Sequence, residues 1–151
     1  MSEIRRVLLA EDNAKDVELT LAALDEHGLA NDVVVVRDGA EAWEYLCREG
    51  RYAQRPPGSP VVVLLDLKMP KVDGFEVLRR MRAHDALRTV PVVMLTSSRE
   101  ERDLAESYRL GANAYVVKPV AFEAFLQSVR SLGLFWGVVN EPPPGTVRRA
   151  A

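Results

Sequence analysis

Short apolar runs alternate with longer segments of helical periodicity along almost the whole of this 151-residue chain. Five of these runs have the length of buried strands: residues 7–10, 32–37, 61–65, 91–95 and 114–117. Because strands that alternate with helices form parallel sheets covered on both faces, the pattern predicts an α/β fold with a five-stranded parallel sheet.

The helical segments between the runs are bounded by glycine, a common stop signal. The first helix is predicted over residues 14–28 and the second over residues 39–50, each ending at a glycine. Gly74, Val77, Leu78 and Met81 have the spacing of one face of a third helix. Further helices are predicted before Gly111, from Leu104, Ala105 and Tyr108, and over an apolar stripe within residues 122–132.

The composition excludes several classes of protein. A net charge of -2 argues against a large basic surface for nucleic acid, and residues 135–151 are too few for a DNA-binding domain. The single cysteine, Cys47, permits no internal disulfide and fits a reducing compartment. No apolar run approaches the roughly 20 residues of a membrane span, and the N-terminal run is too short for a signal peptide. We therefore expect a cytoplasmic protein without direct contact to membrane or nucleic acid.

Chemically distinctive residues follow four of the five predicted strands. Glu11 and Asp12 follow the first, Asp66 the third, Thr96 the fourth and Lys118 the fifth. Since sites in parallel sheets form outside the carboxyl ends of the strands, these side chains are predicted to meet on one rim.

Three carboxylates on one rim repel one another unless a cation joins them. Oxygen ligands without histidine or cysteine favour a hard ion such as Mg²⁺. The lysine is suited to pairing with a phosphoryl oxygen. A carboxylate can itself be phosphorylated, so Asp66, at the end of the apolar run "VVVLLD", is a candidate nucleophile.

Simpler interpretations exist for some of these residues. Glu11 and Asp12 could cap the first helix, and the hydroxyl residues 96–98 could cap the helix before Gly111. Lys118 could be a solvated strand end, and Tyr115 is an ordinary strand aromatic by propensity.

Two other functions are less compatible with the sequence. An aspartyl-phosphate-forming hydrolase is the main alternative, but that class usually has a second acid two residues after the nucleophile, where this chain has Lys68. A flavodoxin-type flavin site needs a phosphate-binding loop after the first strand, and "AEDNAKD" is acidic there.

Four segments, "LLAEDN", "LLDLKMPKVDGFEVL", "PVVMLTSS" and "GANAYVVKPV", resemble the receiver domain of response regulators in two-component signalling. They occur in the family's order over roughly residues 4–134. The resemblance implies a flavodoxin-like, doubly wound sheet with strand order 2-1-3-4-5 and a receiver domain over residues 1–134. It implies a single-domain response regulator that is not an enzyme but a phospho-acceptor assisting its own phosphoryl transfer and dephosphorylation.

The same resemblance implies roles for individual residues. Asp66 would accept a phosphoryl group from a phosphohistidine of a sensor histidine kinase. Glu11 and Asp12 would hold Mg²⁺ together with Asp66 and the backbone carbonyl of Lys68.

The resemblance also implies a switch. Thr96 would donate a hydrogen bond to the phosphoryl group, and Lys118 would form an ion pair with it. Tyr115 would turn inward when Thr96 moves. The bond from Lys118 to Pro119 would be a cis peptide, which only proline makes at low cost.

A narrower likeness concerns single-domain regulators of phytochrome-type histidine kinases, and it is carried by "RDGAEAWEYLCREGRYAQRPPGSPVVVLLDLKMPK", "LTSSREERDLAESYRLGANAYVVKPV" and "LFWGVVNEPPPG". It implies a bacteriophytochrome as the kinase. Residues 135–151 are predicted to be a C-terminal extension that ends in a mobile tail. The apolar residues of the last helix continue into Phe135 and Trp136, so we expect a homodimer through the last helix and this extension. The alternative is a tail folded back on its own domain.

Overall fold

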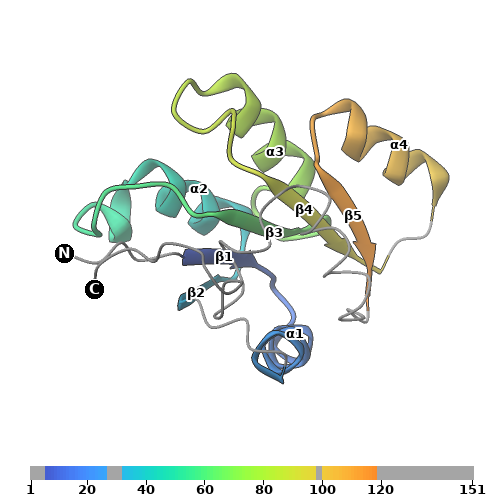
Figure 1. The fold of residues 1–151 in the computed structure, drawn as a ribbon. Helices are drawn as coiled ribbons and strands as arrows, with labels where there is room; N and C mark the ends of the chain where they lie inside the picture. Colours follow the sequence, from blue (N-terminus) through green and yellow to red (C-terminus); the bar gives the residue numbers. More distant parts are fainter. Residues whose placement is uncertain (1–5, 27–31, 98–99, 119–151) are drawn as a thin grey trace, which may run out of the picture.

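The computed structural model describes residues 6–26, 32–97 and 100–118, which form a sheet with helices on both faces (Figure 1). The five strands are β1 (Arg6–Ala10), β2 (Asp32–Val36), β3 (Val62–Asp66), β4 (Val92–Thr96) and β5 (Ala114–Val117). All neighbouring strands are parallel, in the order β2-β1-β3-β4-β5. The predicted α/β fold class and the strand order 2-1-3-4-5 are therefore confirmed.

The central strands β3 and β4 are buried along their whole length, and β1 is buried from its second residue on. Burial on both faces explains why these strands are continuous apolar runs rather than alternating patterns. Two of them extend one residue beyond the predicted runs, because Asp66 pairs with Leu95 and Thr96 pairs with Val117. The pairing thus places two polar residues inside the carboxyl edge of the sheet.

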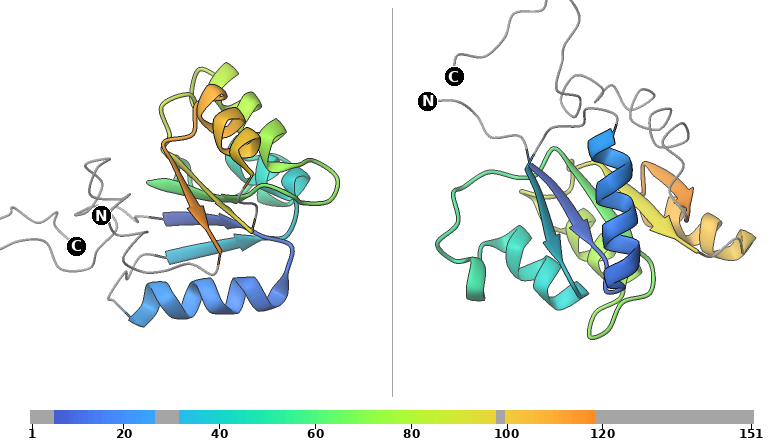
Figure 2. Two further views of the ribbon diagram at one scale, coloured as in Figure 1. Left: turned by 90° about the vertical axis from the view of Figure 1, so that its right-hand side faces the viewer. Right: turned by 90° about the horizontal axis from the view of Figure 1, so that it is seen from below.

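The described helices are α1 (Ala14–Glu26), α2 (Gly39–Cys47), α3 (Gly74–Ala83) and α4 (Glu101–Arg109), with a short 3₁₀ helix, η1 (Gly50–Tyr52). Helix α1 covers one face of the sheet, while α2, α3 and α4 lie on the other (Figure 2). Each face has its own buried apolar cluster, one built around Val7, Leu9 and Leu64 and the other around Leu8, Leu65 and Met94.

The second helix ends earlier than its glycine predicted. Helix α2 ends at Cys47, because Arg48 takes a left-handed conformation with φ 57° and ψ 50°. The Arg48 N–H donates to the Tyr45 carbonyl, and the Glu49 N–H donates to the Glu44 carbonyl. These bonds give two carbonyl groups of the helix's last turn a donor.

Helix α4 forms where the sequence predicted a helix, but its apolar side chains face outward. Leu104 is 38% exposed and Tyr108 is 50% exposed, whereas Ser107 is the buried residue of this helix.

None of the described helices is long and apolar enough to cross a membrane. The predicted last helix, the Lys118–Pro119 bond and the C-terminal extension lie outside the described residues.

The loop between β3 and α3 is held by close backbone contacts. A Cβ on Gly74 would lie 2.2 Å from the Asp66 carbonyl oxygen, and a Cβ on Gly39 would lie 1.8 Å from the Val72 carbonyl oxygen. The Gly74 N–H also donates to the Leu67 carbonyl at 2.8 Å. Glycine is therefore needed at both positions, and the loop that follows Asp66 has little room to move.

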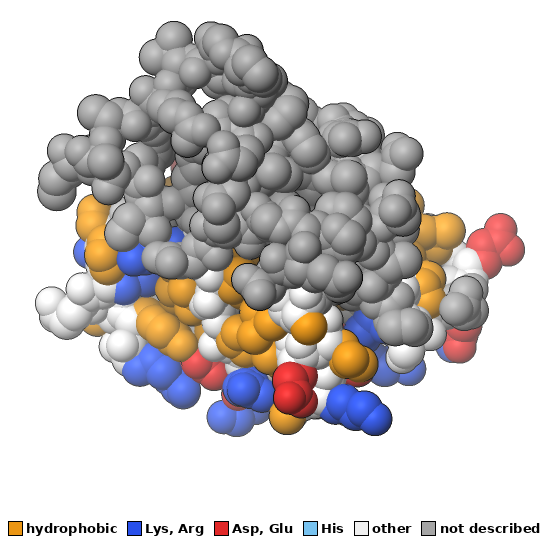
Figure 3. Space-filling model, turned by 60° about the horizontal axis from the view of Figure 1, so that its bottom comes forward, with side chains coloured by type: hydrophobic (Ala, Val, Ile, Leu, Met, Phe, Trp, Pro, Cys, Tyr) orange, Lys and Arg blue, Asp and Glu red, His pale blue; other side chains and the backbone are white. Residues whose placement is uncertain are grey.

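Side chains of both charges lie along the edge of the described part that Figure 3 leaves uncovered. In Figure 3, lysine and arginine side chains alternate with aspartate and glutamate side chains along the edge of the described part.

Candidate functional site

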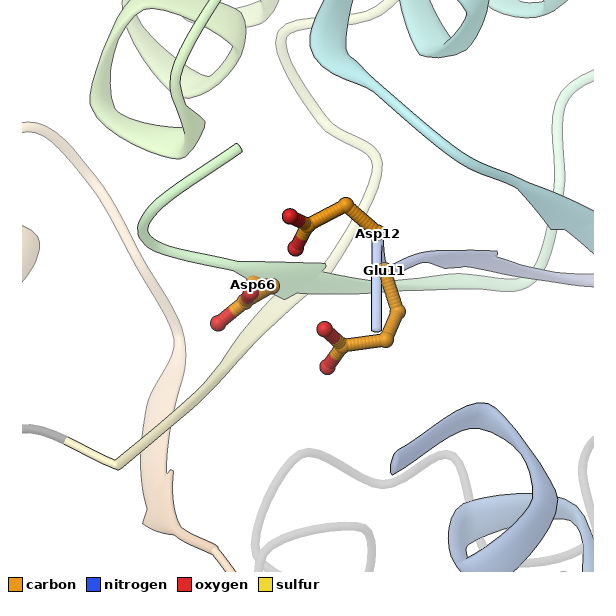
Figure 4. Close-up of side chains that lie close together, drawn as sticks. All are labelled: Glu11, Asp12 and Asp66. Carbon is orange, nitrogen blue, oxygen red and sulfur yellow. The ribbon is translucent and has the colours of Figure 1, made fainter. Parts of the chain in front are cut away.

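Three acidic side chains meet at the carboxyl edge of the sheet. Ala10 of β1 pairs with Leu65 of β3, so the residues that follow them, Glu11 and Asp66, lie side by side at the carboxyl ends of these neighbouring strands. The Glu11 N–H donates to the Val36 carbonyl at 3.0 Å and extends the contact to β2. Glu11, Asp12 and Asp66 each offer a carboxylate oxygen within 4.8 Å of the others, and Figure 4 shows these groups around a common space.

The three acids differ in exposure. Glu11 is 1% exposed and Asp66 is 6% exposed, whereas Asp12 lies at the surface. Burial, reinforced by repulsion from Glu11, raises the pKa of Asp66 to about 7, although Lys118 acts in the opposite direction. An ionised Asp66 is therefore unfavourable here without a further cation.

Lys118 reaches this cluster from the end of β5. Its Nζ donates to Glu11 Oε1 at 2.7 Å and to Asp16 Oδ2 at 2.8 Å, and it lies 3.4 Å from Asp66 Oδ1. Burial alone would lower the pKa of Lys118, but hydrogen bonds to Asp16 and Glu11 and attraction by Asp66 outweigh it and raise the pKa above its ordinary value. The lysine is thus a fixed positive charge beside three carboxylates, and its interpretation as a solvated strand end is excluded.

These residues line a pocket of about 480 Å³. Its other lining residues include Thr96, which is 2% exposed, Lys68, which is exposed, and Ser97. The structure thus brings together all of the residues predicted for acceptor, metal and phosphoryl contacts. Tyr115 is not among the lining residues: it pairs with Met94 and packs, partly buried, against the apolar cluster on the α2 and α3 side.

The helix-capping interpretations are not supported. Asn13, rather than Glu11 or Asp12, caps the start of α1: its Oδ1 accepts from the Asp16 N–H at 3.0 Å, and its carbonyl accepts from the Val17 N–H. The N-cap of α4 is Glu100, beyond Thr96.

Sequence reasoning missed Asp16 as a member of this site. Its signal was weak, since an acid in the first turn of a helix is ordinary. The structure places Asp16 among the lining residues of the pocket, in contact with Lys118, which is 102 residues away in the chain.

The donor set fits a hard divalent cation. Among the described residues, the one cluster able to hold a metal consists of the carboxylates of Glu11, Asp12 and Asp66, with no nitrogen or sulfur donor. A cation there would offset both the burial and the repulsion from Glu11 that raise the pKa of Asp66.

Comparisons with known proteins agree with the fold. The family model "Response regulator receiver domain" matches residues 7–130. The chain is 59% identical to the bacteriophytochrome response regulator AtBRR, with a TM-score of 0.84, covering 93% of this chain and 100% of that one. It is 57% identical to the bacteriophytochrome response regulator RtBRR, with a TM-score of 0.83, covering 95% of this chain and 86% of that one.

A curated relative gives the same result. The response regulator Rcp1 of Synechocystis is 35% identical over 130 residues, which are 86% of this chain and 87% of the relative. The chain therefore belongs to the response regulator receiver domains of two-component signalling.

Proposed function

We propose that Asp66 is the phosphoacceptor of this receiver domain and that it takes its phosphoryl group from a phosphohistidine of a sensor histidine kinase. Receiver domains are signalling phospho-acceptors that work with histidine kinases and use Mg²⁺ in an acidic pocket. The observation that carries the assignment is the position of Asp66, which is 3.4 Å from the Lys118 ammonium in the pocket that Thr96 also lines.

The chemistry follows from this arrangement. A carboxylate oxygen of Asp66 forms a bond to phosphorus while the P–N bond to the donor imidazole breaks, and the imidazole leaves with that electron pair and takes up a proton. The product carries a charge of about −1.5 to −2 and strong acceptor oxygens. Lys118 supplies positive charge to this group, and the Thr96 hydroxyl donates a hydrogen bond to it.

Glu11, Asp12 and Asp66, with the backbone carbonyl of Lys68, would hold Mg²⁺. A bound Mg²⁺ supplies positive charge that offsets the repulsion between the carboxylates and an incoming phosphoryl group. In this proposal the chain acts as a phospho-acceptor that assists its own phosphorylation and dephosphorylation, and not as an enzyme.

Phosphorylation with a small donor tests the acceptor. Acetyl phosphate with Mg²⁺ should add one hydroxylamine-labile phosphoryl group, located on Asp66 by mass spectrometry of proteolytic fragments. Asp66→Asn should remove the label, whereas Asp73→Asn, at the cap of α3, should keep it. Equal labelling of wild type and Asp66→Asn would show that the acceptor is another residue.

The switch would use Thr96 and Tyr115. Thr96 is buried at the end of β4, and Tyr115 lies on the adjacent β5, so a shift of Thr96 toward the phosphoryl group would change the space available to the tyrosine ring. In this proposal Tyr115 turns inward on phosphorylation. NMR signals of a ¹³C-labelled Tyr115 ring should shift with beryllofluoride, a phosphoryl mimic, in the wild type but not in Thr96→Ala.

The similarity to the bacteriophytochrome response regulators AtBRR and RtBRR supports a bacteriophytochrome as the kinase partner. Phosphoryl transfer from a purified bacteriophytochrome kinase should be faster than transfer from a histidine kinase with an unrelated sensor. Equal rates would remove the basis for this partner.

In this proposal the receiver domain spans residues 1–134, and the extension 135–151 joins the last helix in a homodimer. All of these C-terminal residues lie outside the described part, so the support is the sequence pattern of Phe135 and Trp136. Deleting residues 135–151, or changing Trp136→Glu, should give monomers in light scattering at micromolar concentration. A monomeric full-length protein, with or without phosphorylation, would contradict the dimer.

A further inference from the structure

The Lys118 ammonium is shared between the phosphoacceptor cluster and a residue outside it. Its two shortest contacts are to Glu11 Oε1 at 2.7 Å and to Asp16 Oδ2 at 2.8 Å, while Asp66 Oδ1 is 3.4 Å away. An ammonium has three donors, and two of them are directed to Glu11 and Asp16. Asp16 is not part of the three-carboxylate cluster that could hold a metal.

The fold places Asp16 firmly in this position. The residue lies in the first turn of α1, and its backbone N–H donates to the Asn13 side chain at 3.0 Å. Asn13 in turn donates its own N–H to Glu11 Oε2 at 3.2 Å. The start of α1 is thereby tied to the acid that also contacts Lys118, so the Asp16 carboxylate is held next to the ammonium by its own helix.

The ion pair between Lys118 and Asp16 is intermediate between an exposed and a fully buried ion pair. The side chain of Lys118 is 11% exposed and that of Asp16 is 33% exposed. A charge-assisted hydrogen bond in such a position is stronger than an exposed ion pair, yet it can be broken when a stronger anion is near.

We propose that Asp16 is a positioning residue that holds Lys118 back from Asp66 and so sets how readily the lysine reaches a phosphoryl group. This inference rests on the proposed role of Asp66. The phosphoryl group and Asp16 compete for one ammonium. Removing the Asp16 carboxylate therefore favours the phosphorylated form, through Lys118 and not through metal binding.

Asp16→Asn should raise the initial rate of phosphorylation by acetyl phosphate, and the labelled fraction at low donor concentration, by about threefold to tenfold, the effect of losing one partly buried charged hydrogen bond. Asp16→Glu should return the rate toward that of the wild type. The control is Glu18→Gln, which removes one charge from an exposed position of the same helix.

A double-mutant cycle separates positioning from a general charge effect. In a Lys118→Ala background, Asp16→Asn should change the rate no more than Glu18→Gln does. A melting temperature within a few degrees of the wild type, in EDTA and in saturating Mg²⁺, would show that the fold is kept.

The outcomes are distinct. A rate for Asp16→Asn that is lower than the wild-type rate, or equal to that of Glu18→Gln, would overturn this inference while leaving Asp66 as the acceptor. An increase that persists in the Lys118→Ala background would also overturn it, because the effect would not pass through the lysine. A wild-type protein that takes no label on Asp66 would overturn the proposed function together with this inference.

Discussion

Replacing Asp66 by asparagine should stabilise the metal-free protein, although it removes the proposed acceptor. Asp66 is 6% exposed and faces Glu11 and Asp12, so its ionised form is unfavourable in the folded state. Asparagine has nearly the same size, and its amide oxygen can still accept from Lys118. The substitution therefore removes a repulsive charge without leaving a cavity.

The expected gain in the free energy of unfolding follows from the pKa of Asp66. The folded-state pKa of Asp66 is about 7, against an ordinary value of 3.8. A tenfold change in proton affinity is worth about 1.4 kcal/mol, so the difference sets a ceiling of roughly 4 kcal/mol on the destabilisation by ionised Asp66. Because the surroundings relax and water enters the open pocket, we expect about 1–3 kcal/mol at pH 8.

The sign of the pH dependence is also fixed. Between about pH 4 and pH 7 the folded protein keeps a proton on Asp66 that the unfolded chain has released. The free energy of unfolding contributed by this group is therefore greatest below pH 4, falls as the pH rises toward 7, and levels off above it. Asp66→Asn should lack this decline, so the two proteins should differ more at pH 8 than at pH 5.

Urea unfolding followed by circular dichroism, in EDTA at pH 5 and pH 8, measures the stability difference between the wild type and Asp66→Asn and its change with pH. Asp85→Asn, at an exposed acid after α3, is the matched control and should change little. Adding Mg²⁺ at pH 8 should stabilise the wild type more than Asp66→Asn, since ligand binding favours the folded state that binds it. A wild type as stable as Asp66→Asn in EDTA at pH 8, or an equal difference at both pH values, would show that the ionised Asp66 carboxylate does not destabilise the folded protein.

Three further predictions concern the metal, the acceptor loop and the support of the sheet. Asp12→Ala should lose most of the Mg²⁺-induced rise in melting temperature, and an unchanged rise in differential scanning fluorimetry would place the metal elsewhere. Gly74→Ala should lower both stability and the rate of labelling by acetyl phosphate, because its Cβ would lie 2.2 Å from the Asp66 carbonyl oxygen; a normal rate would show that the loop can shift freely. The Arg82 guanidinium donates to the carbonyls of Gly111 and Val90 and to Asn113 Oδ1. Arg82→Met should therefore lower the free energy of unfolding in urea by about 2–4 kcal/mol. Arg79→Met, which removes an exposed ion pair, is the control and should have little effect.

Local patterns in the sequence were enough to predict the fold class and to place most of the pocket's lining residues on one rim. Strand and helix periodicities are local properties, so the five apolar runs could be recognised without any knowledge of long-range contacts. A parallel arrangement requires the residues after those runs to share one edge, and this requirement alone predicted that Glu11, Asp12, Asp66, Thr96 and Lys118 meet. The order of the strands, by contrast, came from the family resemblance and not from periodicity.

Features that depend on packing between distant segments could not be predicted from these local patterns. Asp16 and Lys118 are 102 residues apart, and nothing near either residue in the chain indicates their contact. Burial of Asp66 beside Glu11 sets its pKa, and the outward orientation of Leu104 and Tyr108 depends on where α4 meets the sheet. The physical reason is the same in each case: hydrogen bonds, desolvation and charge interactions act over a few ångströms in space, whereas sequence patterns report only on neighbours along the chain.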